Sequence, residues 1–164
     1  MGKHEMVNFK YSFSDRITSL DRDRIAIASG RDLRVSPKNT REVTNAIKGM
    51  KLGEAKEFLE QVILMKQAVP FKRHNKKRGH KKGLERFKWH AGAYPEKSAR
   101  LVYQVLENAE SNAEYKGLDL ERVKILHAAT LKGRKIKRYI ERAHGRSTPY
   151  NQTLSHIEIA LIET

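Results

Sequence analysis

Two short stretches of the chain concentrate basic side chains, the residue type that binds phosphate groups. Residues 72–88 hold nine Lys and Arg residues against one acid, Glu85, and residues 132–146 hold seven against Glu141. Outside both stretches the chain is nearly neutral, with 18 basic and 17 acidic residues. Like-charged blocks on a neutral body repel themselves and settle against an external polyanion. The charge distribution therefore predicts a nucleic-acid partner.

Three groups of side chains are candidates for contact with this partner. The basic candidates of the first stretch are Lys72, Arg73, Lys76, Lys77, Arg78, Lys81, Lys82, Arg86 and Lys88. Those of the second are Lys132, Arg134, Lys135, Lys137, Arg138, Arg142 and Arg146. The aromatic candidates for stacking on bases are Phe87, Trp89 and Tyr139. The alternative is that these charges are only solvated on flexible loops.

A further phosphate site is predicted at Ser36-Pro37, which is typical of a helix start with an N-cap hydroxyl and proline at the first position. The exposed amides of such a start, together with Lys38 and Arg41, could hold a phosphate. Folded RNA suits irregular basic extensions better than duplex DNA, because RNA is read by shape, single-stranded loops and backbone contacts. Neither a recognition-helix motif nor a zinc finger is found. A DNA-compacting protein remains a weaker alternative.

Catalytic chemistry is not supported by the residue types in these stretches. His74, His80 and His90 lie within or beside the first basic stretch, whose positive charge opposes a divalent cation, so we expect no metal site and no cofactor. The chain contains no cysteine, and nucleophile-elbow, phosphate-loop and paired-histidine motifs are absent. Glu107, Glu110 and Glu114 follow a helical spacing that indicates a solvated face. We therefore expect that the protein is not an enzyme.

Hydrophobic periodicity predicts three helices between and before the basic stretches. The first begins at 36–37 and ends near Gly49, and the second covers about 52–65 and is closed by Pro70. The third begins at 95–96, repeats small and apolar residues along one face, and ends near Gly117. Short strand pieces are expected at 25–29 and 33–35, broken at Gly30.

Near the C-terminus the period changes to that of strands. An outgoing strand is predicted over 123–131 and a returning strand over 157–161, with His156 and Glu158 facing away from the core. Few apolar residues lie between these strands, so we expect an arm over about 131–154 with its turn at His144-Gly145, where Gly145 supplies a positive φ. At about 3.3 Å per residue this arm would reach roughly 30–40 Å.

The whole chain, 1–164, is expected to form one domain, with a basic loop inserted at about 66–95 and the arm at about 131–154. Loop and arm should become ordered only when RNA binds, because neither has a core of its own. Apolar runs are too short for a membrane span, and no signal peptide is recognised, so a soluble cytoplasmic protein is expected.

Five motifs of the chain recur together in one known family. They are Ser36-Pro37-Lys38, Asn108-Ala109-Glu110-Ser111-Asn112-Ala113-Glu114, Lys137-Arg138, Arg142-Ala143-His144-Gly145-Arg146 and Ser155-His156-Ile157-Glu158. Together they resemble the large-subunit ribosomal protein family called L twenty-two. The resemblance covers roughly residues 22–163, and the insertion at 66–95 looks like the archaeal and eukaryotic branch. It implies an α+β fold with three helices packed on a small three-stranded antiparallel sheet and a long protruding β-hairpin.

The same resemblance implies a structural constituent of the large ribosomal subunit. Members bind large-subunit ribosomal RNA, support subunit assembly and line the nascent-polypeptide exit tunnel with the hairpin. By this resemblance, RNA contacts along the arm would be made by Lys137, Arg138, Arg142 and Arg146. The tunnel-facing tip would comprise Arg142, Ala143, His144 and Gly145. Neighbouring ribosomal proteins and the nascent chain would be partners, without direct membrane insertion. The alternative is an RNA-processing or RNA-chaperone protein outside the ribosome, which would need converging carboxylates.

Overall fold

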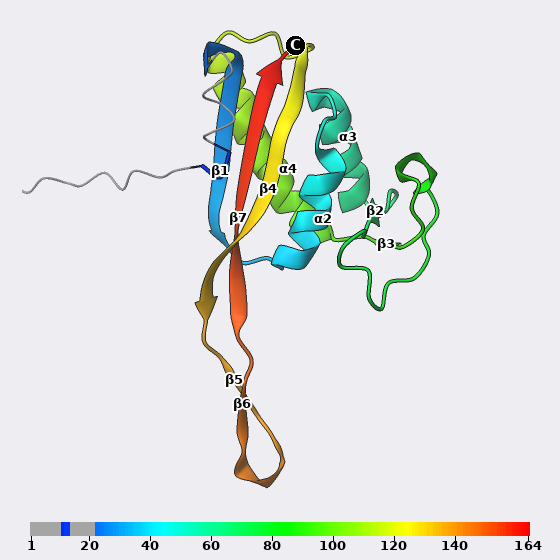
Figure 1. Ribbon diagram of the computed structural model, residues 1–164, viewed down its shortest axis with the longest axis vertical. Coiled ribbons are helices and arrows are strands. Elements are labelled where there is room, and N and C mark those ends of the chain that lie inside the picture. Colours follow the sequence, from blue (N-terminus) through cyan, green and yellow to red (C-terminus); the bar gives the residue numbers. More distant parts are fainter. Residues whose placement is uncertain (1–10, 14–21) are drawn as a thin grey trace, which may run out of the picture.

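The central sheet consists of three antiparallel strands, β1 (Ile25–Leu33), β7 (Gln152–Glu163) and β4 (Val123–Ile136), in that order (Figure 1). The computed structural model describes residues 11–13 and 22–164. The C-terminal strand β7 lies in the middle and pairs Ile159 with both Ala28 and Ala128. The last strand of the chain is therefore the central strand of the sheet, and it connects β1 with β4 through hydrogen bonds.

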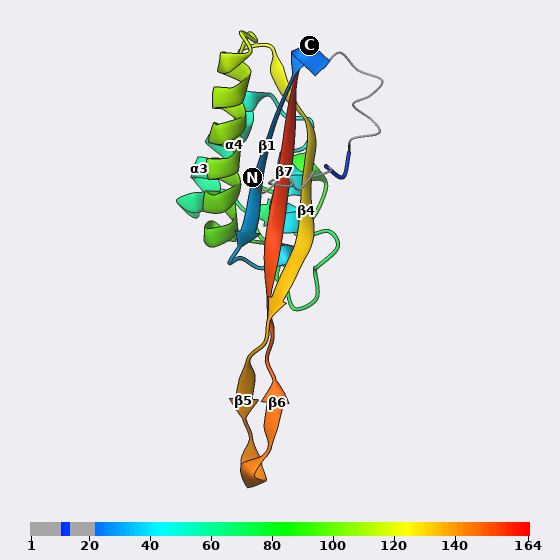
Figure 2. The same cartoon turned by 90° about the vertical axis from the view of Figure 1, so that its left-hand side faces the viewer.

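Three helices cover one face of this sheet, as the α+β prediction required (Figure 2). They are α2 (Pro37–Ile47), α3 (Leu52–Ile63) and α4 (Glu96–Tyr115), which agree with the predicted helices to within a few residues. Gly117 adopts φ +72° just after α4 and ends it as predicted. The predicted end of the second helix near Met65 is confirmed to within two residues, whereas Pro70 does not itself end the helix and lies in the two-residue strand β2 (Val69–Pro70).

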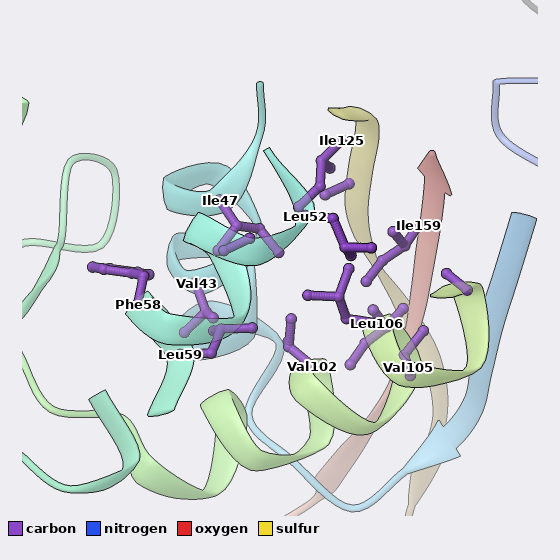
Figure 3. Close-up of a cluster of buried hydrophobic side chains, with 14 of the residues drawn as sticks. Val43, Ile47, Leu52, Phe58, Leu59, Val102, Val105, Leu106, Ile125 and Ile159 are labelled. Atoms are coloured by element: carbon purple, nitrogen blue, oxygen red, sulfur yellow. The ribbon is translucent and has the colours of Figure 1, made fainter. Parts of the chain in front are cut away.

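The main core lies between the helices and the sheet (Figure 3). Its apolar side chains come from all three helices and from the inward positions of the strands, and they include Val43, Ile47, Leu52, Phe58, Leu59, Val102, Val105, Leu106, Ile125 and Ile159. Each such side chain contributes about 1.5–3 kcal/mol when it is fully buried. This core fixes the position of α2, α4 and the end of the sheet from which the arm projects.

The prediction that Gly30 interrupts the first strand was wrong. β1 runs continuously through Gly30, with an irregularity in its pairing to β7 between Gly30 and Leu33. A Cβ atom at Gly30 would lie 2.8 Å from Val105 Cγ2 and 2.9 Å from Leu33 Cδ1. Glycine is needed here because α4 approaches the strand closely, and not because the strand ends.

Glu158 does face away from the helices, but it is fully buried. Its Oε2 accepts hydrogen bonds from the backbone N–H and the hydroxyl of Ser12, at 3.1 and 2.6 Å. Arg31 approaches its other oxygen at 3.5 Å. Beside it, Phe13 packs on Ile25 and Ala160 in a small second core behind the sheet. The alternation of apolar and polar residues along β7 correctly predicted the face on which Glu158 lies. The burial of Glu158 was not predicted, because residues 11–13, which cover this face, lie outside every predicted helix and strand.

Gly92 in the loop between α3 and α4 is packed so closely that a larger residue there should destabilise the protein. In the two-residue strand β3 (Gly92–Ala93), a Cβ at Gly92 would lie 2.7 Å from Leu84 Cδ1 and 2.9 Å from the Val69 carbonyl oxygen. We expect Gly92→Ala to lower the free energy of unfolding by about 1–3 kcal/mol, because the backbone must move. Chemical denaturation checks this value.

The control is Gly53→Ala in the first turn of α3, where nothing lies within 4 Å of the added Cβ. This change should be neutral or stabilising by up to about 1 kcal/mol. Equal stability of the two variants would contradict the close-packing explanation.

Candidate nucleic-acid interface

The arm is a long hairpin that leaves the body where the central sheet ends (Figures 1 and 2). Beyond β4 and β7 it continues as β5 (Tyr139–Glu141) paired with β6 (Ser147–Pro149). Its tip is a single turn, η3 (Ala143–Gly145), in which φ is +59° at His144 and +64° at Gly145. The turn position and the positive φ of Gly145 are confirmed. All residues from 137 to 151 are exposed, so the arm has no core of its own.

Most basic side chains of the arm have no acidic partner within the described part of the chain. All seven of them, from Lys132 to Arg146, are exposed. Within the described part of the chain, only Arg134 has a carboxylate within 4 Å, at 3.8 Å from Asp32 Oδ1. Tyr139 is 68% exposed and presents its ring among these charges. The arm thus offers cations and an aromatic face to an external ligand.

The basic loop is held by contacts within itself and by contacts to the body, which corrects the expectation that it is ordered only by RNA. Leu84 is buried, and the indole N–H of Trp89 donates to the Phe71 carbonyl oxygen at 2.9 Å. An isolated bridge pairs His80 with Ala91 across the loop. The sequence showed no apolar period here because single residues, rather than a repeating face, make these attachments. All nine basic side chains of 72–88 are nevertheless exposed.

A buried carboxylate holds the start of this loop. Glu42 on α2 is 1% exposed, and its oxygens accept the backbone N–H groups of Lys72, Arg73 and His74 at 3.1, 3.3 and 3.0 Å. The ring Nδ1 of His74 lies 2.9 Å from Glu42 Oε1. Sequence reasoning missed Glu42, although it is the single acid of α2 and stands next to the inward-facing Val43.

The aromatic residues of the loop are less available than predicted. Phe87 is half-buried, meets Phe58 edge-on with centroids 5.8 Å apart, and is covered by the Arg86 guanidinium at 4.8 Å. It therefore contributes to packing, and base stacking by its exposed part remains a prediction. Trp89 is also half-buried and stacks on His90 at 5.0 Å. A base contact by Trp89 remains a prediction.

A basic hollow of about 800 Å³ lies where the arm joins the body. The lining cations are Arg34, Lys38, Lys97, Lys132 and Arg138. Ser36 occupies the N-cap position of α2 but makes no side-chain capping bond, so the predicted hydroxyl cap was wrong. Lys38 lines the hollow, whereas Arg41 is half-buried and lies outside it. The sequence analysis did not identify Arg34 and Lys97 as binding residues. The sequence marks them only as basic residues that lie close to predicted helix starts.

Two carboxylates, Glu60 on α3 and Glu110 on α4, join these helices through hydrogen bonds. Glu110 accepts a hydrogen bond from Lys56 Nζ at 2.8 Å, and this bond raises the pKa of Lys56. Glu60 accepts the Tyr103 hydroxyl at 2.9 Å, which raises the pKa of Tyr103. Glu110 is thus a half-buried partner across two helices, which corrects its assignment to a solvated face, while Glu107 and Glu114 are exposed. Among residues 11–13 and 22–164, no cluster of three His, Asp or Glu residues suits a metal ion.

The sequence pattern of the family described as "Ribosomal protein L22p/L17e" matches residues 28–162. The chain belongs to this ribosomal protein family. The matched range includes all three helices, the basic loop and the arm, so the family match covers both cationic surfaces. The resemblance carried by the sequence motifs is thereby confirmed.

Archaeal relatives of this ribosomal family extend over nearly the same length. "Large ribosomal subunit protein uL22" of Methanopyrus kandleri is 53% identical over 144 residues, covering 88% of this chain and 90% of the relative. The protein of the same name from Archaeoglobus fulgidus is 50% identical, with 85% and 88% covered. That from Staphylothermus marinus is 43% identical, with 96% and 99% covered. None of the described helices is long and apolar enough to cross a membrane.

Proposed function

We propose that this protein is a non-enzymatic, structural constituent of the large ribosomal subunit that binds large-subunit ribosomal RNA through the basic loop and the arm. The observation that carries the proposal is the exposure of all sixteen basic side chains on these two segments. Among the described residues, the charged group of a single one of them, Arg134, lies within 4 Å of a carboxylate oxygen. Relatives 43–53% identical over most of their length are named as large-subunit proteins, which supports the same assignment here.

In this proposal the arm passes between RNA segments and lines the nascent-polypeptide exit tunnel with its tip, residues 142–145. The support is the shape of the hairpin: it is narrow, lacks a core and exposes every side chain from 137 to 151. A two-stranded ribbon of this kind is marginal in water and gains order from a partner along its length. Neighbouring ribosomal proteins meet the remaining surface of the body, and the protein supports subunit assembly.

The test is the salt dependence of binding to a large-subunit ribosomal RNA transcript. If about half of the sixteen cations meet phosphates, about eight counterions leave, and the slope of log affinity against log salt is roughly −6. Filter binding across a salt series measures the slope, with a transfer RNA and a DNA duplex of equal length as comparison ligands. We expect the ribosomal transcript to bind most tightly at moderate salt.

A nearly salt-independent affinity would refute the proposed phosphate contacts. Equal affinity for the DNA duplex and the ribosomal transcript would instead favour a DNA-compacting protein, because direct charge neutralisation alone does not distinguish the two ligands.

A further inference from the structure

Two acid-free hollows meet at a single lysine between the basic loop and the arm. The hollow at the base of the arm contains Lys38 in its lining. A second hollow, of about 380 Å³, is lined by Lys38 and by the loop residues Arg73, Lys76 and Arg78. Neither lining contains Asp or Glu. Lys38 therefore joins the two hollows into one cationic path across the start of α2.

Lys38 and Lys97 are placed where a cation is electrostatically unfavourable for the protein alone. Each occupies the first turn of its helix, α2 and α4 respectively. The helix dipole disfavours positive charge at this end and favours an anion. No carboxylate of the described residues lies within 4 Å of either lysine, and the adjacent Glu96 pairs with Arg100 at 2.8 Å instead. An external anion in the hollow would neutralise both lysine side chains and would lie near the start of α2, where Ser36 and Pro37 also line the hollow.

A third hollow, similar in size to the second, is lined by both basic and acidic residues. About 420 Å³ in volume, it contains Lys51 but also Glu54, Glu110 and Glu121. The positive charge of Lys51 is offset by these three carboxylates, so this hollow does not attract a polyanion. The absence of acids from the other two linings is therefore a property of that region and not of the whole surface.

We propose that Arg34 and Lys97, together with Lys38, bind one continuous segment of RNA backbone that runs from the basic loop to the base of the arm. This inference rests on the proposed function and assigns part of its RNA-binding surface. The arm changes its pairing at this point, because the β4–β7 ladder ends at Ile136 and Gln152 and the next pair is Tyr139 with Pro149.

The hollow is lined from both sides of this joint, since Arg34 and Lys97 belong to the body while Arg138 belongs to the arm. Bound RNA backbone would thus hold the arm in a fixed direction relative to the body. Arg34, Lys97 and Arg138 are all exposed, so the full-length protein presents the site without rearrangement.

The experiment compares two full-length double variants on the ribosomal transcript. Arg34→Gln/Lys97→Gln removes two charges from the hollow, and Lys51→Gln/Arg122→Gln removes one Lys and one Arg from exposed positions near acids. For the first variant we expect the slope of log affinity against log salt to become about 1.4 less steep, because two phosphate contacts are lost. Its affinity near 0.15 M salt should fall about tenfold. The second should keep the wild-type slope and stay within about threefold in affinity.

Thermal melting of both variants accompanies the titration, and Arg34→Gln/Lys97→Gln should melt no lower than wild type, because it removes a cation from a helix start. If the two variants bind identically while wild type shows its steep slope, the inference is overturned and the proposed function stands. If wild type itself does not bind the transcript, the proposed function fails and the inference fails with it.

Discussion

Loss of five arm cations should weaken binding to large-subunit ribosomal RNA by about three orders of magnitude near 0.15 M salt. The changes are Lys135→Gln, Lys137→Gln, Arg138→Gln, Arg142→Gln and Arg146→Gln. Each lost phosphate contact removes about 0.7 from the salt slope, so the five together remove about 3.5. The melting temperature should be nearly unchanged, because all five side chains are exposed and the hydrogen bond from Arg142 Nε to Thr148 Oγ1 is exposed as well. Filter binding and thermal melting measure the two effects independently.

The control removes five exposed charges from the body instead, and these are Arg24, Lys48, Lys51, Arg100 and Arg122. It lowers the net charge by the same amount, so it tests whether location or total charge decides affinity. We expect less than a tenfold loss, since these charges lie away from the arm and act only through the screened field of the whole protein. Equal losses in the two variants would show that net charge alone determines binding.

The arm was predictable because its signal is local. Apolar residues are sparse between Lys132 and Thr153, and Gly145 stands where a turn needs a positive φ. The helices were predictable for the same reason, since periodic apolar faces and the stop at Gly117 lie within one segment. Signals contained in 10–20 consecutive residues therefore gave the elements and their order.

The errors concern contacts between segments far apart in the chain. Gly30 was read as a strand break, but the side chain that requires glycine there is Val105 on α4. Glu158 was placed on the correct face, yet its burial depends on Ser12, 146 residues away. Phe87 was considered only for base stacking, and its edge-on contact with Phe58 on α3 was not foreseen. A pattern read along the chain identifies a face but not what packs against it.

The basic loop shows the same limit at the site itself. Its charge was visible in the sequence, but its attachment depends on Glu42, which lies 30 residues before Lys72. The lack of an apolar period suggested a segment without a core of its own that only RNA could order. The hydrogen bonds to Glu42 instead fix residues 72–74 against α2 in the free protein, and this difference has a measurable consequence.

Replacing the buried Glu42 should release the start of the basic loop and destabilise the protein. We expect Glu42→Gln to lower the free energy of unfolding by about 2–3 kcal/mol, because hydrogen bonds to a charged acceptor are worth about 1.5–3 kcal/mol each and the neutral amide keeps only one accepting oxygen. Glu42→Ala should cost about 3–5 kcal/mol, because three backbone N–H groups lose their acceptor altogether. Chemical denaturation measures both values.

Hydrogen exchange then separates loss of the loop anchor from general destabilisation. In Glu42→Gln the amides of Lys72, Arg73 and His74 should exchange faster than the global unfolding loss accounts for, whereas core amides should follow that loss. The control, Glu54→Gln, changes an exposed acid in the first turn of α3 and should leave these three amides unaffected. Unchanged exchange at residues 72–74 in Glu42→Gln would mean that the loop is positioned by Leu84 and Trp89 alone. RNA affinity should fall with the faster exchange, because an unanchored loop must lose conformational entropy before its cations reach the phosphates.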